Sequence, residues 1–234
     1  METLLRVMSC ILSVVVFCLV LVWMSAVVTS YSKQSDGTVM TKDLSGFSWT
    51  TNDPRVFNWH PVLMSFGFVL CTSQAILVFE TKPFTHRTNK LIHATCHTLT
   101  LVSVIIGTVA VFRFHNEHNI RNLYSLHSWL GISTLVLYAM QYMFGFLVYL
   151  YPGVGAKLRL QVLPNHIAFG IGLVAIVGMT AVAGIMEKLA FNGSCNVNGV
   201  LHGKSVQGYL TPGCALANTA GLLLLLLVVA LTST

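Results

Sequence analysis

The sequence predicts an all-α membrane protein with six transmembrane helices. Only 9% of the 234 residues are charged and 55% are hydrophobic, whereas soluble domains carry about 25% charged residues. The chain also has six long stretches without Asp, Glu, Lys or Arg, and a helix of roughly 20 apolar residues crosses a hydrocarbon core. These uncharged stretches are residues 7–32, 61–79, 94–112, 128–156, 167–186 and 205–234.

We expect one membrane domain over residues 1–234. A helix satisfies its own backbone hydrogen bonds in lipid, and the apolar segments lack the alternation of β-barrel strands. The first segment could instead be a cleaved signal peptide, but its apolar run exceeds the roughly 7–15 residues typical of one. The expected spans are about 5–28, 60–79, 91–112, 123–150, 162–185 and 214–232.

Polar connections separate the spans. Residues 29–56 and 115–122 fall on one side of the membrane, and the basic segments 80–90 and 151–161 fall on the other. Six spans place both termini on the same side. The net charge is +6, but no basic run indicates a nucleic-acid partner, so the lipid bilayer is the expected surrounding.

The last connection carries the best indication of orientation. Cys195 and Cys214 flank it and predict a disulfide if the loop is extracytosolic, and Asn192-Gly193-Ser194 is a glycosylation sequon at Asn192. Placing this loop outside makes both termini cytosolic. The distribution of Lys and Arg does not decide the orientation. Six of the 13 basic residues would then be cytosolic and seven outside, and an excess on the cytosolic side is needed for a decision.

Four histidines stand near the starts of spans two to five. They are His60, His93, His127 and His166, at separations of 33, 34 and 39 residues. Since successive spans are antiparallel, His60 and His127 fall near one face, and His93 and His166 near the other. In a four-helix bundle these partners lie diagonally and point inward, as cofactor ligands commonly do.

Paired histidines at this depth predict haem. Two imidazoles facing each other hold an iron from both sides and leave no open position, so such a haem transfers electrons only. The pattern thus predicts a central four-helix dihaem bundle. The alternative is a proton relay or a histidine-lined metal-ion transporter without haem. His97 shares the helix face of His93, and spacing does not choose between them.

Short motifs surround the histidines, and together they resemble a known family. They are Asn58-Trp59-His60-Pro61-Val62-Leu63-Met64, Lys90-Leu91-Ile92-His93, Tyr124-Ser125-Leu126-His127-Ser128-Trp129-Leu130-Gly131, Gly145-Phe146 before Tyr151-Pro152, Pro164-Asn165-His166 and Glu187-Lys188-Leu189. Over about residues 55–225 the chain resembles the cytochrome b561 family of ascorbate-dependent transmembrane electron carriers. It looks closest to the animal lysosomal and duodenal ferric-reductase branch.

The resemblance implies two b-type haems. His60 and His127 would hold the extracytosolic haem, and His93 and His166 the cytosolic one, which favours His93 over His97. It implies an oxidoreductase that passes electrons from cytosolic ascorbate to ferric iron or monodehydroascorbate on the other side. It also implies a homodimer, and a late endosomal or lysosomal membrane, with the plasma membrane or a secretory vesicle as alternatives.

The resemblance further implies a cytosolic ascorbate site. Lys90 and Arg159 match family positions that hold the ascorbate anion, with Arg87 and Lys82 as helpers. Cations suit this ligand because they donate strong hydrogen bonds to anionic oxygens. The alternative is that the four are interfacial cations that anchor helix ends.

On the far face, the resemblance implies an acceptor site at His115. Asn116, Glu117 and His118 lie beside it in the sequence. Imidazole nitrogen and carboxylate oxygen can together bind Fe³⁺ weakly. The alternative is a solvated polar loop with no ligand.

Overall fold

Six helical segments form the body of the protein. The computed structural model describes residues 2–151 and 153–233, so Pro152 of the Tyr151-Pro152 motif lies outside the described residues. Within them, six segments are long and apolar enough to cross a membrane, which confirms the predicted number and class. They are Thr3–Ala26, Pro54–Thr81, His86–Glu117, Leu126–Leu150, Ala156–Asn192 and Pro212–Thr232.

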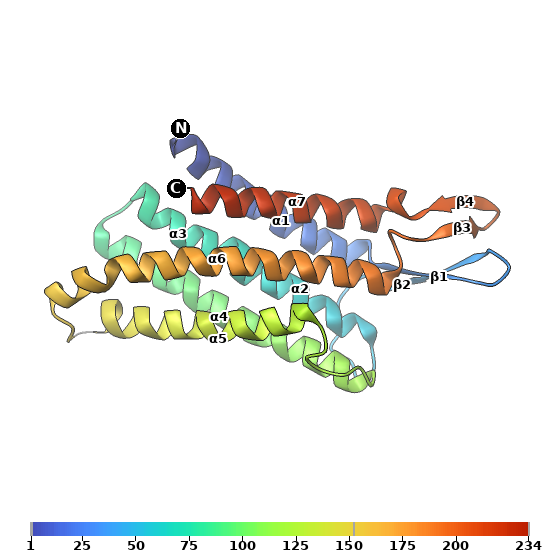
Figure 1. Cartoon of the computed structure of the whole chain (residues 1–234), viewed down its shortest axis with the longest axis horizontal. Coiled ribbons are helices and arrows are strands. Elements are labelled where there is room, and N and C mark those ends of the chain that lie inside the picture. Colours follow the sequence, from blue (N-terminus) through green and yellow to red (C-terminus); the bar gives the residue numbers. More distant parts are fainter. Residues whose placement is uncertain (1, 152, 234) are drawn as a thin grey trace.

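The six spans run side by side along the long axis of the molecule (Figure 1). The second span is an unbroken series of η1, α2, η2 and α3, and η3 continues α5. The elements are α1 (Glu2–Ala26), η1 (Pro54–Asn58), α2 (Trp59–Met64), η2 (Ser65–Cys71), α3 (Thr72–Thr81), α4 (His86–Glu117), α5 (Leu126–Gly145), η3 (Phe146–Leu150), α6 (Ala156–Asn192), η4 (Gly208–Leu210) and α7 (Pro212–Thr232). Helices α4 and α6, at 32 and 37 residues, are longer than the predicted spans.

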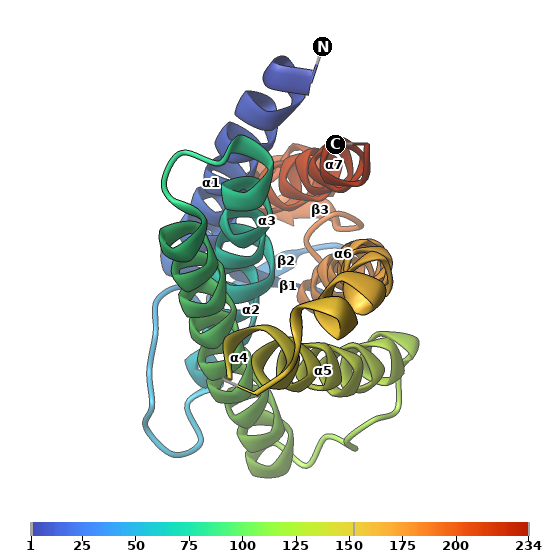
Figure 2. The ribbon, with the colours of Figure 1, turned by 90° about the vertical axis from the view of Figure 1, so that its left-hand side faces the viewer.

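Spans two to five surround the interior of the bundle, and α1 and α7 pack beside them. Figure 2 shows α3, α4, α5 and α6 in the end view, with α1 and α7 together at one side. Trp23 and Met24 of α1 are buried against Ala217 and Ala220 of α7. The small alanines let these two helices approach closely, as is common in membrane bundles.

The second span widens to π-helical geometry over η2. A Cβ atom at Gly67 would lie 2.5 Å from Ser103 Oγ of α4. Glycine therefore lets α4 cross close to this segment. Such π-helical stretches often lie near functional sites.

Hydroxyl side chains fix where three of the helices begin. Thr85, Ser125 and Thr211 accept hydrogen bonds from the backbone amides at the starts of α4, α5 and α7. An oxygen at this position satisfies an amide that the helix itself leaves free. These caps set the axial position at which the histidines of α4 and α5 enter the bundle.

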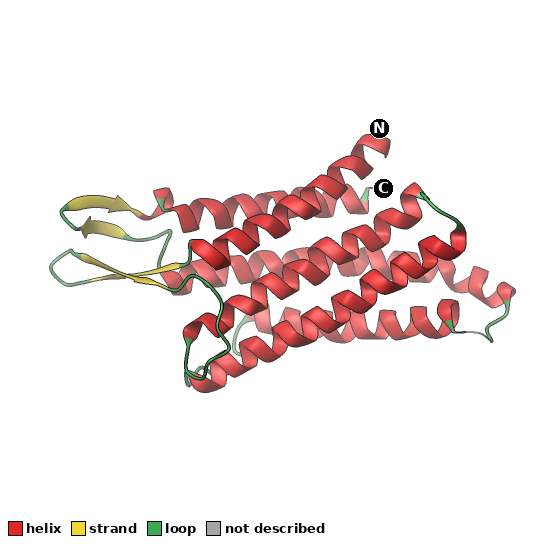
Figure 3. Ribbon diagram, turned by 180° about the vertical axis from the view of Figure 1, so that it is seen from behind, coloured by secondary structure: helices red, strands yellow, loops and turns green. Residues whose placement is uncertain are grey.

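Two β-hairpins extend from the end opposite the start of α1 and the end of α7 (Figures 1 and 3). They pair β1 (Thr29–Lys33) with β2 (Val39–Asp43), and β3 (Asn198–Leu201) with β4 (Lys204–Gln207). The two hairpins touch where the Val200 amide donates to the Gly37 carbonyl oxygen at 3.2 Å. These strands lie in segments for which the sequence predicted only polar loops.

The predicted disulfide between Cys195 and Cys214 is present. It ties the segment just before β3 to the start of α7. An isolated two-stranded hairpin is only marginally stable, so this covalent link stabilises the β3–β4 hairpin. Asn192, the predicted glycosylation site, is only 4% exposed at the end of α6. Glycosylation of Asn192 stays a prediction.

Candidate functional site

The first histidine pair lies on the hairpin side of the bundle. The ring centres of His60 on α2 and His127 on α5 are 6.1 Å apart. His60 Nδ1 lies 3.1 Å from the Gly107 carbonyl oxygen, and His127 Nδ1 lies 2.9 Å from that of Thr180. We call His60 and His127 the hairpin-side pair. Two spans supply its rings, and two others supply the carbonyl oxygens that face them.

The second pair lies on the side where α1 begins and α7 ends. The ring centres of His93 on α4 and His166 on α6 are 6.4 Å apart. His93 Nδ1 lies 2.7 Å from the Ala75 carbonyl oxygen of α3. Gln141 of α5 donates to the His166 carbonyl oxygen at 2.7 Å, and the same amide nitrogen lies 3.0 Å from His166 Nδ1. We call this the terminus-side pair.

Backbone carbonyls fix the tautomer of three of these rings. A carbonyl oxygen can only accept, so Nδ1 of His60, His93 and His127 carries the proton and Nε2 keeps a free lone pair. This is the usual second contact of a metal-bound histidine.

Both pairs fit the geometry of bis-histidine haem. A metal–imidazole nitrogen bond is about 2.0–2.1 Å long, so two rings on one iron have centres about 6.3 Å apart. The observed 6.1 and 6.4 Å agree with this value. A cavity of about 190 Å³ adjoins the hairpin-side pair, and its lining is mostly apolar.

Glycines clear space around one ring of each pair. A Cβ atom at Gly184 of α6 would lie 2.6 Å from His127 Cε1. A Cβ atom at Gly145, the last residue of α5, would lie 3.3 Å from His166 Cε1. Side chains at these two positions would compete with the imidazoles for space.

His97 is held separately from the terminus-side pair. Its ring centre is 4.4 Å from that of His93. Its Nδ1 lies 2.6 Å from the hydroxyl oxygen of Tyr138 on α5. This hydrogen bond gives His97 a structural partner, and the choice of His93 as ligand stays a prediction.

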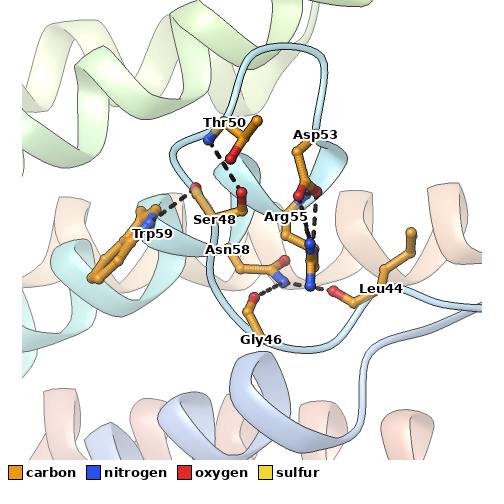
Figure 4. A network of polar contacts seen from close by, with 8 residues as sticks. All are labelled: Leu44, Gly46, Ser48, Thr50, Asp53, Arg55, Asn58 and Trp59. Carbon is orange, nitrogen blue, oxygen red and sulfur yellow. Dashed lines mark hydrogen bonds and ion pairs between the residues drawn. The ribbon is translucent and has the colours of Figure 1, made fainter.

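A polar network anchors the chain just before His60 (Figure 4). The buried Asn58 amide donates to the carbonyl oxygens of Leu44 and Gly46 at 2.7 and 2.8 Å. Trp59 Nε1 donates to the Ser48 carbonyl oxygen at 3.2 Å. The Asn58-Trp59 part of the motif therefore fixes the position at which His60 enters the membrane.

An ion pair completes the network in Figure 4. Arg55 donates to Asp53 at 2.6 Å, and this interaction holds the pKa of the Asp53 carboxyl well below its usual range. The pair closes the turn that leads into η1, and the Asp53 side chain also accepts from the Arg55 backbone amide.

The α3–α4 connection and the starts of α4 and α6, which carry the four predicted ascorbate cations, lie at the terminus-side end (Figure 1). Lys82 and Arg87 are exposed, and Lys90 and Arg159 are half-buried. Among the described residues, none of these four side chains forms an ion pair with a carboxylate. Arg159 Nε is buried without a hydrogen-bond partner in the part of the chain described. Their role in binding ascorbate stays a prediction.

The predicted acceptor residues do not converge on one point. His115 lines the hairpin-side cavity and contacts Asn122, whose amide donates to Asn116. Glu117 instead accepts from Arg113 at 2.7 Å, and His118 Nδ1 lies 2.9 Å from the Phe114 carbonyl oxygen.

The role of His115, Asn116, Glu117 and His118 in binding the acceptor stays a prediction. Within residues 2–151 and 153–233, no group of three or more His, Cys, Asp or Glu is arranged to hold a metal ion. Successive helical residues point in different directions, so adjacency in the sequence does not place residues 115–118 around one ion.

Several residues of the site were missed at the sequence level. Gln141 and Tyr138 contact His166 and His97, and Gly184 makes room for His127. Lys188 lines the hairpin-side cavity. Of these residues, only Lys188 could have been identified from the sequence, because an ionisable residue at the end of an apolar span is by default a candidate for a functional site.

Known proteins share this sequence pattern. The family model described as eukaryotic cytochrome b561 matches residues 59–192. The chain is 46% identical over 142 residues to a probable ascorbate-specific transmembrane electron transporter of Oryza sativa subsp. japonica, covering 60% of this chain and 61% of the relative. It is 39% identical over 187 residues to a lysosomal membrane ascorbate-dependent ferrireductase of Mus musculus, covering 76% and 72%.

A plant ferrireductase matches a similar length. The chain is 37% identical over 176 residues to transmembrane ascorbate ferrireductase 2 of Arabidopsis thaliana, covering 75% of this chain and 73% of the relative. The matches to the Oryza sativa relatives span only about three fifths of their length, 61% and 60%.

Proposed function

Because the chain belongs to the cytochrome b561 family, we propose that it is an ascorbate-dependent transmembrane oxidoreductase. The observation that carries the proposal is the presence of two facing histidine pairs at opposite ends of one four-helix core. The names of the relatives, ascorbate-specific electron transporter and ascorbate ferrireductase, support the same activity.

The family binds haem, and the proposal assigns two haems to this chain. His60 and His127 hold one, and His93 and His166 hold the other. Haem bound in this way supplies reversible one-electron chemistry within the membrane. The backbone carbonyls keep Nε2 of His60, His93 and His127 available as a ligand, and Gln141 holds the backbone and ring of His166.

The donor end is the terminus-side end, where the cations gather. Lys90 and Arg159 attract and orient the ascorbate anion, with Arg87 and Lys82 at the entrance. The Tyr149 ring lies 5.2 Å from the His166 ring, and its hydroxyl donates to the Arg159 carbonyl oxygen at 3.4 Å. These contacts place the start of α6 beside the terminus-side pair.

The acceptor end is the hairpin-side end. His115 borders the same cavity as His60 and His127, so an acceptor held there would be close to that pair. The acceptors that fit the family are ferric iron, as substrate, or monodehydroascorbate. Asn122 fixes the His115 ring through its side-chain oxygen at 3.1 Å.

The orientation follows from the disulfide. A stable disulfide needs an oxidising compartment, and the Cys195–Cys214 bridge lies on the hairpin side. This supports an extracytosolic hairpin side and cytosolic termini. The name of the mouse relative, a lysosomal membrane ferrireductase, supports a lysosomal membrane for this protein. The resemblance to the family also implies a homodimer, which belongs to the proposal.

Transfer across a sealed membrane tests the proposal. The purified protein is reconstituted in liposomes that contain ascorbate, ferric citrate is added outside, and ferrous iron is measured with a membrane-impermeant chelator. We expect reduction with wild-type protein, and only background reduction with His127→Ala, with His166→Ala or without trapped ascorbate. Equal rates for wild type and both histidine variants would contradict the proposal.

A further inference from the structure

Lys188 places a cation at the wall of the hairpin-side cavity. The residue lies in the last two turns of α6 and lines the same cavity as His60 and His127. Its Nζ atom lies 4.1 Å from the centre of the Phe57 ring. The Phe57 ring centre is in turn 6.0 Å from that of His60. A cation thus stands beside the pair proposed to hold one haem.

This cation has no anionic partner. Lys188 makes no hydrogen bond or ion pair within the described residues, and its ammonium group lies over the face of the Phe57 ring. The neighbouring Glu187 also lines the cavity, but its two carboxylate oxygens accept from the Tyr124 hydroxyl at 2.8 Å and from Ser125 Oγ at 3.1 Å. No ion pair joins it to Lys188 among the described residues.

Two other cations of the spans do have anionic partners. Arg113 pairs with Glu117 at 2.7 Å, and Arg6 pairs with Glu80 at 3.3 Å. A charge in an apolar environment is costly unless it is paired, and an aromatic face only partly replaces water. The cavity beside Lys188 therefore fits a ligand that carries a negative charge.

We propose that Lys188 forms an ion pair with a carboxylate group of the haem held by His60 and His127. The proposal rests on the haem-binding function proposed above. Haem b carries two carboxylate side chains on one edge of an otherwise apolar ring. The cavity wall is mostly apolar, and of its two charged residues Glu187 is hydrogen-bonded to Tyr124 and Ser125, whereas Lys188 has no ion pair among the described residues. The pair neutralises a negative charge near the iron, so it favours the reduced form of this haem over the oxidised form.

The test is a redox titration of the purified protein, with haem counted per chain. The variant is Lys188→Gln, and the matched control is Lys204→Gln, which removes an exposed cation of β4 on the same side. We expect both variants to keep two haems. Lys188→Gln lowers one of the two midpoint potentials and leaves the other unchanged, whereas Lys204→Gln changes neither.

Further outcomes separate the possible failures. Loss of one haem in Lys188→Gln with its recovery in Lys188→Arg supports the proposal, because recovery requires a cation. Two haems with unchanged potentials overturn it. A changed apparent KM for a soluble anionic acceptor with unchanged potentials also overturns it and assigns Lys188 to that substrate. If Lys188→Gln does not accumulate, Lys188→Met takes its place with the same expectations. Absence of haem from the wild type would instead contradict the proposed function.

Discussion

The substitution Gly184→Ala tests whether the hairpin-side pair depends on the space beside His127. The added Cβ atom would lie 2.6 Å from His127 Cε1 and 3.0 Å from Nδ1, whereas carbon atoms pack at about 3.5–4.0 Å. The ring must therefore retreat by about 1 Å, several times the roughly 0.2 Å tolerance of a metal–ligand distance. We expect one haem to be lost, with a stability cost of about 1–3 kcal/mol typical of overpacking.

The assay is extraction and quantification of haem per chain, followed by redox titration of what remains. The matched control is Gly172→Ala on the same helix, where a Cβ atom meets nothing within 4 Å. We expect two haems in the control and one in Gly184→Ala. Gly145→Ala should have a milder effect at the other pair, because its closest contact, to His166 Cε1, is 3.3 Å. Two haems at wild-type potentials in Gly184→Ala would refute the reasoning.

Three further predictions concern other parts of the structure. His93→Ala should lose one haem and His97→Ala should keep both, as counted in the purified proteins; the reverse result would make His97 the ligand. Cys195→Ser should lower the free energy of unfolding by about 3 kcal/mol because it opens a loop of 19 residues, with haem content unchanged. Partial burial and the Glu187 carboxylate raise the pKa of Tyr124 to about 12, so its stabilising contribution is present below pH 10 and lost from about pH 10 to 12. Tyr124→Phe should reduce the loss of thermal stability between about pH 10 and 12, measured as the unfolding temperature. An unchanged dependence of the unfolding temperature on pH would show that Tyr124 does not cause the loss.

The sequence predicted the helical spans and the pairing of the histidines because both follow from simple periodicity. Antiparallel helices of similar length return a residue to the same face after two crossings, and this relates His60 to His127 and His93 to His166. Helices α4 and α6 extend beyond the predicted spans. Hydropathy reports the part of a helix that crosses hydrocarbon, and a helix can continue beyond the membrane.

The contacts that orient the imidazoles were not predictable from residue types. The oxygens that face His60, His93 and His127 belong to the backbones of Gly107, Ala75 and Thr180. Every residue has a carbonyl group, so the sequence does not reveal which one a ring will meet. Only the packing of the helices decides it.

The hairpins and the acceptor residues show two further limits. Strands β1–β4 are four or five residues long within polar connections, and the two hairpins touch at Val200 and Gly37, which are distant in sequence. Glu117 was grouped with His115 because the two are close in the chain, but its side chain turns to Arg113. The Arg113–Glu117 pair is an i,i+4 pair that the local sequence does contain, whereas the contact between the two hairpins is not encoded locally.

The most direct test of the account is an optical difference spectrum of the purified protein with haem counted per chain. Spectra are recorded after reduction by ascorbate and by dithionite, each against the oxidised protein. The account predicts two b-type haems per chain, largely reduced by ascorbate. A colourless protein after expression with ample haem would contradict it and favour the alternative of a histidine-lined proton or metal-ion transporter.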